Sequence, residues 1–163
     1  MEGFRQYITE LFEKPFPLHK ITKVGGVGRG TFISYLYTMN PNLKPTGNNI
    51  VSVEFHLDRY ASDTDWLLEF SRGSAIHITN QGDASRVFAS VLHAVQDFIT
   101  KHKPNTISFS ALKGKDNIGS RVSLYTALIK RFAPKLGYEL TKRVGYNNES
   151  NHEVLFVLAK KDP

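Results

Sequence analysis

The chain has 163 residues, of which 40% are hydrophobic and 22% charged, a composition typical of one ordinary globular domain. It has no cysteine, which excludes disulfides and thiolate chemistry and would leave zinc only His and carboxylate ligands. No apolar run approaches the roughly 18 residues of a membrane span, and the start lacks the layout of a secretory signal. We therefore expect a cytoplasmic protein with no membrane partner.

The net charge of +6 comes from 21 Lys and Arg against 15 Asp and Glu. A basic balance of this size attracts polyanions, either nucleic acid or the phosphates of a nucleotide cofactor. The positive residues are scattered along the chain, and no recognisable DNA-binding motif is present. We therefore expect the basic residues to form a solvated surface, and a nucleic-acid-binding module is the alternative.

The N-terminal half predicts one short helix and then strands. Residues 4–13 have the apolar spacing of an amphipathic helix, which Pro15 and Pro17 end, so we assign residues 1–15 to this segment. A glycine-rich stretch at 24–30 follows. Alternating apolar residues and turn residues then predict four strands, at 31–37, 50–57, 66–70 and 75–79.

The C-terminal half alternates helix and strand. Helical spacing with one buried stripe predicts a long helix over 83–101. The elements predicted after it are a strand at 106–111, a second amphipathic helix at 120–136 ended by Gly137-Tyr138, and two antiparallel strands at 138–141 and 152–159. The sequence thus predicts a single α+β domain, residues 1–163, with its core in 30–160. Its sheet is mixed and mostly antiparallel, with a crossover helix and a second helix.

Two segments look like nucleotide- or phosphate-binding motifs but lack residues that those motifs require. The glycines at 24–30 lack the lysine of a P-loop, since Gly30 is followed by Thr31, and they precede a strand, so a loop or bulge is favoured. His77-Ile78-Thr79 is similar to one element of two-histidine phosphoesterases, but His152 has no matching hydroxyl partner. No pair of histidines has metal-ligand spacing, so we predict no metal site.

A general base, if the protein is an enzyme, is expected on the central antiparallel strands. The candidates are Glu54, His56 and Glu69. Glu54 and His56 share one strand face, while the residues between them share the other. Glu54 is taken as the candidate catalytic base, and a solvent-facing polar stripe is the alternative explanation.

The order of the elements resembles the GNAT family of N-acetyltransferases. The local similarity is best from Ser120-Arg121 through Leu124-Tyr125 to Leu136-Gly137-Tyr138, which looks like the family helix that carries a Leu-Tyr pair. In the family this tyrosine commonly protonates the leaving coenzyme A thiolate, and by position Tyr125 would do so here. Tyr125 also lies on the apolar stripe of its helix, so a core position is the alternative.

A second similarity lies where the predicted strand 75–79 leads into the long helix. Gln81, Gly82, Asp83 and Ala84 look like a reduced form of the family loop Gln/Arg-x-x-Gly-x-Gly/Ala, whose backbone amides bind the coenzyme A pyrophosphate. The resemblance implies acetyl-CoA as cofactor, bound by these residues with Ser85 and Arg86. The leading Gln or Arg is absent here. Asp83 also places a carboxylate near the phosphate, which Arg86 could offset, and Asp83 suits a helix N-cap.

The chain also resembles small uncharacterised proteins of tailed bacteriophages. Glu10-Leu11-Phe12-Glu13 followed by Lys14-Pro15-Phe16 is similar to their short helix and Lys-Pro-aromatic step. Phe4–Glu10 looks like a leader that directs proteins into phage heads, and Ile8-Thr9-Glu10 like a prohead protease site. An ordinary capping helix is the alternative. This resemblance implies a host-cytoplasmic or virion location.

The leading hypothesis is therefore a phage-type protein of GNAT-like fold that transfers acetyl from acetyl-CoA to a small-molecule or protein amine. The first alternative is a non-catalytic phage accessory or head-packaged protein that keeps the fold without cofactor. Its partners would be phage head proteins, or DNA bound through the basic surface. The second alternative is a nucleic-acid-binding module.

Overall fold

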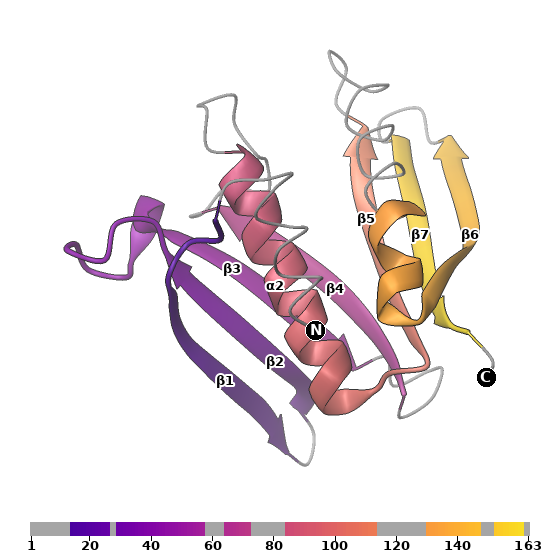
Figure 1. The fold of residues 1–163 in the computed structure, drawn as a ribbon, viewed down its shortest axis with the longest axis horizontal. Coiled ribbons are helices and arrows are strands. Elements are labelled where there is room, and N and C mark those ends of the chain that lie inside the picture. The colour runs from indigo at the N-terminus through magenta and orange to yellow at the C-terminus, as the bar shows by residue number, and fades with distance from the viewer. Residues whose placement is uncertain are drawn as a thin grey trace. The chain divides into compact units, whose positions relative to one another are not determined.

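The computed structural model describes residues 14–26, 29–57, 64–72, 84–113, 130–147 and 152–161 (Figure 1). The elements are β1 (Leu18–Gly26), β2 (Arg29–Thr38), the 3₁₀ helix η1 (Gly47–Asn49), β3 (Ile50–Leu57), β4 (Asp65–Arg72), α2 (Ala84–His102), β5 (Thr106–Lys113), the 3₁₀ helix η2 (Ala133–Leu136), β6 (Tyr138–Asn147) and β7 (His152–Lys160). The strands hydrogen-bond in the order β1-β2-β3-β4-β5-β7-β6. The β4–β5 pair is parallel, whereas β1–β2, β2–β3, β5–β7 and β6–β7 are antiparallel. The predicted α+β class with a mixed, mostly antiparallel sheet is confirmed.

Contacts divide the chain into two compact units, residues 1–56 with 69–102 and residues 57–68 with 103–163. The first unit contains β1, β2, η1, β3 up to His56, α2 and the second half of β4. The second contains Leu57, the first half of β4, β5, η2, β6 and β7. The single domain of residues 1–163 stays a prediction. None of the described helices has the length and apolar character needed to cross a membrane.

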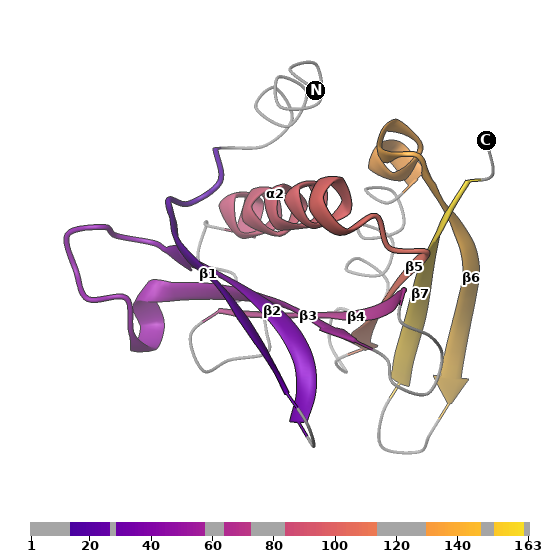
Figure 2. The same cartoon turned by 90° about the horizontal axis from the view of Figure 1, so that it is seen from below.

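The core of the first unit lies between α2 and one face of the antiparallel strands. Figure 2 shows α2 lying along that face. Period-two alternation, which sends successive side chains to opposite faces, buries Ile33, Tyr35 and Tyr37 of β2 and Val51, Val53 and Phe55 of β3. The ring of Phe55 stacks on that of Phe98 of α2, with centroids 4.0 Å apart and planes 3° from parallel. The apolar stripe predicted for the long helix is therefore its buried face.

The first strand was not predicted. β1 pairs antiparallel with β2, and a register shift between Val24 and Gly26 marks a bulge inside the glycine-rich stretch. A Cβ atom on Gly25 would lie 3.0 Å from Thr31 Oγ1, so a larger residue there would crowd its neighbour on β2. Leu18 and Ile21 of β1 are about 40% exposed. This strand lies at the sheet edge, and none of its described side chains is buried, so it lacks the buried apolar face on which the sequence prediction relied.

The second unit is built around β7, which lies between β5 and β6. Phe109 of β5 is paired with Phe156 of β7, and their rings stack with centroids 5.0 Å apart. Tyr138 at the start of β6 is buried and donates its hydroxyl hydrogen to the carbonyl oxygen of Pro104. Gly137 adopts a left-handed conformation, φ +82°, and its N–H caps η2. The predicted stop at Gly137-Tyr138 is confirmed.

The remaining predicted elements agree with the structure where it describes them. The strands at 31–37, 50–57, 66–70 and 106–111 are confirmed as β2, β3, β4 and β5, the helix at 83–101 as α2, and the last two strands as β6 and β7. Of the second helix, residues 130–132 are helical and η2 follows directly. The predicted helix 4–13, the strand 75–79 and residues 120–129 lie outside the described residues.

Replacement of Phe98 by alanine should destabilise the protein by about 3–5 kcal/mol, because the change removes a fully buried ring and leaves a cavity beside Phe55. Urea unfolding followed by circular dichroism measures the difference. Leu43→Ala is the matched control, since that side chain is 60% exposed; it should change the free energy of unfolding by less than about 0.5 kcal/mol. A cost for Phe98→Ala no larger than that of the control would contradict the packing described.

Candidate functional site

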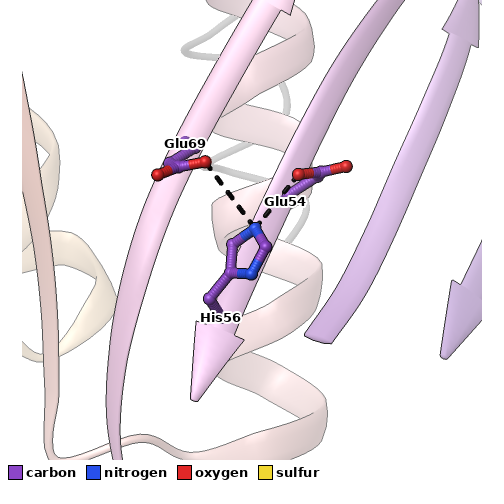
Figure 3. Close-up of side chains that lie close together, drawn as sticks. All are labelled: Glu54, His56 and Glu69. Carbon is purple, nitrogen blue, oxygen red and sulfur yellow. Dashed lines mark hydrogen bonds and ion pairs between the residues drawn. The ribbon is translucent and has the colours of Figure 1, made fainter. Parts of the chain in front are cut away.

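The three candidate base residues converge on the outer face of the first unit. Nε2 of His56 lies 3.0 Å from Oε2 of Glu54 and 3.7 Å from Oε2 of Glu69 (Figure 3). Glu54 and His56 come from β3, and Glu69 comes from β4, the neighbouring strand. We call Glu54, His56 and Glu69 the His56 cluster.

The cluster exists because of the alternation along β3. Val53 and Phe55 point into the core under α2 and are fully buried, so Glu54 and His56 must point to the opposite face. Phe32 of β2 is the register partner of His56, and the two rings stack with centroids 5.2 Å apart and planes at 26°. This contact orients the imidazole. Sequence reasoning grouped Glu54 with His56 correctly but missed Phe32, whose contact depends on the strand register.

The short contact in the cluster bears on which nitrogen of His56 carries hydrogen. Because a carboxylate only accepts hydrogen bonds, an ionised Glu54 requires a hydrogen on Nε2 of His56. A neutral imidazole in this tautomer has a lone pair on Nδ1. The side chains of Glu54 and His56 are 36% and 34% exposed, whereas Glu69 is 73% exposed. Glu69 is therefore the weaker partner in electrostatic terms.

A second polar group lies on the buried side of the same strands. Tyr35 Oη donates to Asp97 Oδ2 at 2.7 Å, and Asp97 Oδ2 also lies 2.9 Å from Nζ of Lys101. Tyr37 Oη lies 2.8 Å from Nδ1 of His93. Both tyrosine side chains are fully buried. A buried hydroxyl without a hydrogen-bond partner would destabilise the fold, and these bonds give each hydroxyl a partner.

These contacts shift the ionisation of the groups that make them. Burial and then the hydrogen bond to Asp97 raise the pKa of Tyr35 far above its usual range, and burial followed by the charge of Asp97 does the same to the pKa of Tyr37. Burial opposes ionisation of Asp97, but its bonds to Tyr35 and Lys101 outweigh that effect and lower its pKa. Asp97 is therefore held as a carboxylate between a phenol and an ammonium group.

The residues predicted to bind coenzyme A are only partly described. Ala84 and Ser85 are the first residues of α2, whereas Gln81, Gly82 and Asp83 lie outside the described residues, as does Tyr125. Arg86 is described. Its Nε donates to the carbonyl oxygen of Lys14 at 3.1 Å, and its guanidinium lies 4.2 Å from the ring centroid of Phe16.

The segment containing Lys14 and Phe16 is thus attached to the first turns of α2. The amide of Phe16 donates to Oγ of Ser90 at 2.9 Å, which adds a second bond to the same helix. Arg86 has a structural partner that sequence reasoning did not foresee, because Lys14 is distant in sequence. The structure brings Glu54, His56 and Glu69 together. Among the described residues, it shows no comparable cluster of the residues predicted to bind coenzyme A.

Comparisons with known proteins are sparse. No family model matches the chain, and no curated protein matches it either. Among solved structures, the chain is similar to a protein of Desulfovibrio desulfuricans assigned to the GNAT acetyltransferase family, with 9% identity and a TM-score of 0.46 over 78% of this chain and 68% of that one. A similarity of this size assigns neither a family nor an activity.

Replacement of Asp97 by asparagine should lower stability in a pH-dependent way. The pKa of Asp97 is lower in the folded than in the unfolded protein, so its contribution is present above the unfolded value and is lost as pH falls through the folded value. At pH 7 the variant should be less stable by about 1–2 kcal/mol, and the gap should stay constant down to about pH 4 and narrow at lower pH. Thermal unfolding at pH 2–7 tests this, with Glu139→Gln, an exposed carboxylate, as control. A gap independent of pH would contradict the charge-pairing account.

Proposed function

We propose that this chain has a GNAT-like fold and transfers acetyl from acetyl-CoA to an amine. The observation that carries the proposal is the strand order. β4 and β5 are parallel neighbours, the chain between them contains α2, and β7 lies between β5 and β6. The elements thus follow the order of an antiparallel meander, a helix, a parallel central strand and a closing antiparallel pair. This is the order on which the resemblance of the sequence to the GNAT family rests.

The short parallel pairing of β4 with β5 supports a binding position beside β5 for the extended pantetheine arm of acetyl-CoA. Its described pairs run from Asp65↔Thr106 to Leu67↔Ser108, whereas β5 pairs with β7 from Thr106 to Lys113. Beyond Ser108, the described ladder of β5 therefore involves one neighbouring strand instead of two. Where a strand edge has no strand partner among the described residues, its amides and carbonyls can pair with an extended, amide-containing pantetheine arm.

The start of α2 supports the predicted anion site. Its first turn contains no acidic residue, and a helix start favours negative charge through its exposed amides. Arg86 uses Nε for its bond to Lys14, and a guanidinium has further N–H donors that suit a phosphate. We propose that Gln81, Gly82, Asp83 and Ala84, with Ser85 and Arg86, hold the pyrophosphate.

Acetyl-CoA, when bound, would supply an acetyl thioester and a thiolate leaving group. The proposed role of Glu54 is to hold the proton of His56 on Nε2, so that Nδ1 of His56 or a carboxylate of the cluster accepts a proton from the incoming ammonium. The amine nitrogen would then bond to the carbonyl carbon as the carbon–sulfur bond breaks, and Tyr125 would donate a proton to the sulfur. The second proton that the nitrogen loses would return to the phenolate of Tyr125, which leaves a neutral thiol, an amide and a restored phenol. The acceptor would be a small-molecule or protein amine.

The alternative of a phage accessory or head-packaged protein without cofactor stays a prediction from the sequence. The same holds for DNA binding through the basic surface. Neither has a described contact or cluster that favours it over acetyl transfer. A cofactor-binding measurement separates both from the proposal.

Acetyl-CoA at 100 times its dissociation constant should stabilise the protein by about 2.7 kcal/mol, which for this size is a rise in melting temperature of about 5–10 °C. Differential scanning fluorimetry measures the shift. Acetyl-pantetheine, which lacks the pyrophosphate, is the matched ligand and should give a much smaller shift. An unchanged melting temperature at millimolar acetyl-CoA would refute the proposed cofactor.

Tyr125→Phe and Glu54→Gln should each reduce the acetyl-CoA- and amine-dependent release of thiol by about 10²–10⁴-fold, because each removes a proton-transfer group or its partner. The thermal shift with acetyl-CoA should persist in both variants, since neither residue is proposed to hold the pyrophosphate. Thiol release is followed with a polyamine and a lysine-containing peptide as acceptors. Glu139→Gln serves as control. Full activity in Tyr125→Phe would remove that residue from the mechanism.

A further inference from the structure

We propose that the His56 cluster binds a divalent transition-metal ion of the zinc class. Its three side chains each offer one ligand atom, and all three atoms lie within 4.8 Å of one another. The sequence prediction of no metal site rested on the spacing of histidine pairs. This cluster instead joins one histidine to two carboxylates from neighbouring strands, which spacing along the chain does not reveal.

The distances suit one ion among the three groups. With bonds of about 2.1 Å, the ligand atoms around a tetrahedral zinc ion lie about 3.4 Å apart. Nε2 of His56 lies 3.0 Å from the Glu54 oxygen and 3.7 Å from the Glu69 oxygen, on either side of that value. The two carboxylate oxygens lie within 4.8 Å of each other, and rotation of the long and mostly exposed side chain of Glu69 can bring its oxygen closer to that of Glu54.

The scaffold holds the two central ligands firmly. Glu54 and His56 are fixed by β3, whose other face is buried under α2, and the imidazole of His56 stacks on Phe32. A ligand set on paired strands is positioned more precisely than one on loops. The partial exposure of all three groups leaves coordination positions open for water.

The charges of the cluster favour a cation. Among the described residues, the ion pairs of Glu54 and Glu69 are those to His56, so two carboxylates share one imidazole. The single hydrogen on Nε2 can be directed at one carboxylate only, and the 3.7 Å distance to Glu69 exceeds hydrogen-bond range. A divalent ion would neutralise both carboxylates at once and bond to Nε2 in place of its hydrogen.

The donor set selects the class of metal. One imidazole nitrogen with two carboxylate oxygens suits zinc, nickel, cobalt or copper, whereas magnesium and calcium prefer sets made of oxygen alone. Zinc is the probe of choice because it undergoes no redox change that would complicate the measurement. A metal-bound cluster has no hydrogen on Nε2, so it cannot at the same time accept protons in the way proposed for acetyl transfer. The inference therefore stands apart from the proposed function, and binding is measured without acetyl-CoA.

The test is isothermal titration calorimetry of the untagged full chain with zinc chloride, because a histidine tag would itself bind zinc. We expect one high-affinity site per chain, with affinity at least tenfold lower in His56→Ala and reduced in Glu69→Gln. His19→Ala, which removes an exposed histidine on β1, is the matched control and should leave the affinity unchanged. Magnesium chloride should not compete at equal concentration.

The outcomes that overturn the proposal are distinct from a folding failure. Glu69 is 73% exposed, so Glu69→Gln should fold normally even if His56→Ala does not. The site is refuted if wild type does not bind zinc, or if both folded variants bind zinc as tightly as wild type does. Equal affinity for magnesium would refute the transition-metal assignment. Proton and nitrogen NMR of the His56 ring provides a second readout, since metal bonding at Nε2 should move its resonance while those of His19 stay in place.

Discussion

The contact between α2 and one face of β2 and β3 determines which side chains of these strands are buried and which are polar and exposed. One face of these strands packs against the helix, through the stacked rings of Phe55 and Phe98 and the hydrogen bond from Tyr35 to Asp97. Because side chains alternate along a strand, Glu54 and His56 must then lie on the opposite face. The polar cluster is therefore a geometric consequence of how the core is packed.

The two faces of these strands hold their polar groups in different ways. On the inner face, each tyrosine hydroxyl has one partner on α2, and the bond between Tyr35 and Asp97 is short and partly shielded from water. On the outer face, His56 is shared by two carboxylates of unequal exposure. Shielded, fully satisfied groups specify structure, whereas a partly exposed group that lacks a full set of partners is suited to binding something else.

Sequence reasoning recovered elements whose periodicity was strong. The helical stripe of residues 83–101 and the alternation of 50–57 each reflect burial on one side, and both are confirmed. It failed for β1, because an edge strand with Leu18 and Ile21 exposed has no one-sided pattern to detect. Local patterns also cannot supply register between strands, which is why neither the stacking of Phe32 on His56 nor the approach of Glu69 could be derived.

The position of β7 has a consequence for how the polypeptide reaches its final form. β7 supplies the antiparallel partner of β5 and of β6 alike, yet it follows both of them in the sequence. During synthesis at about 5–20 residues per second, β5 emerges from the ribosome well before residues 152–160 do. Its apolar residues, among them Ile107 and Phe109, must then wait for several seconds without that partner, an interval in which chaperone binding would protect the nascent protein.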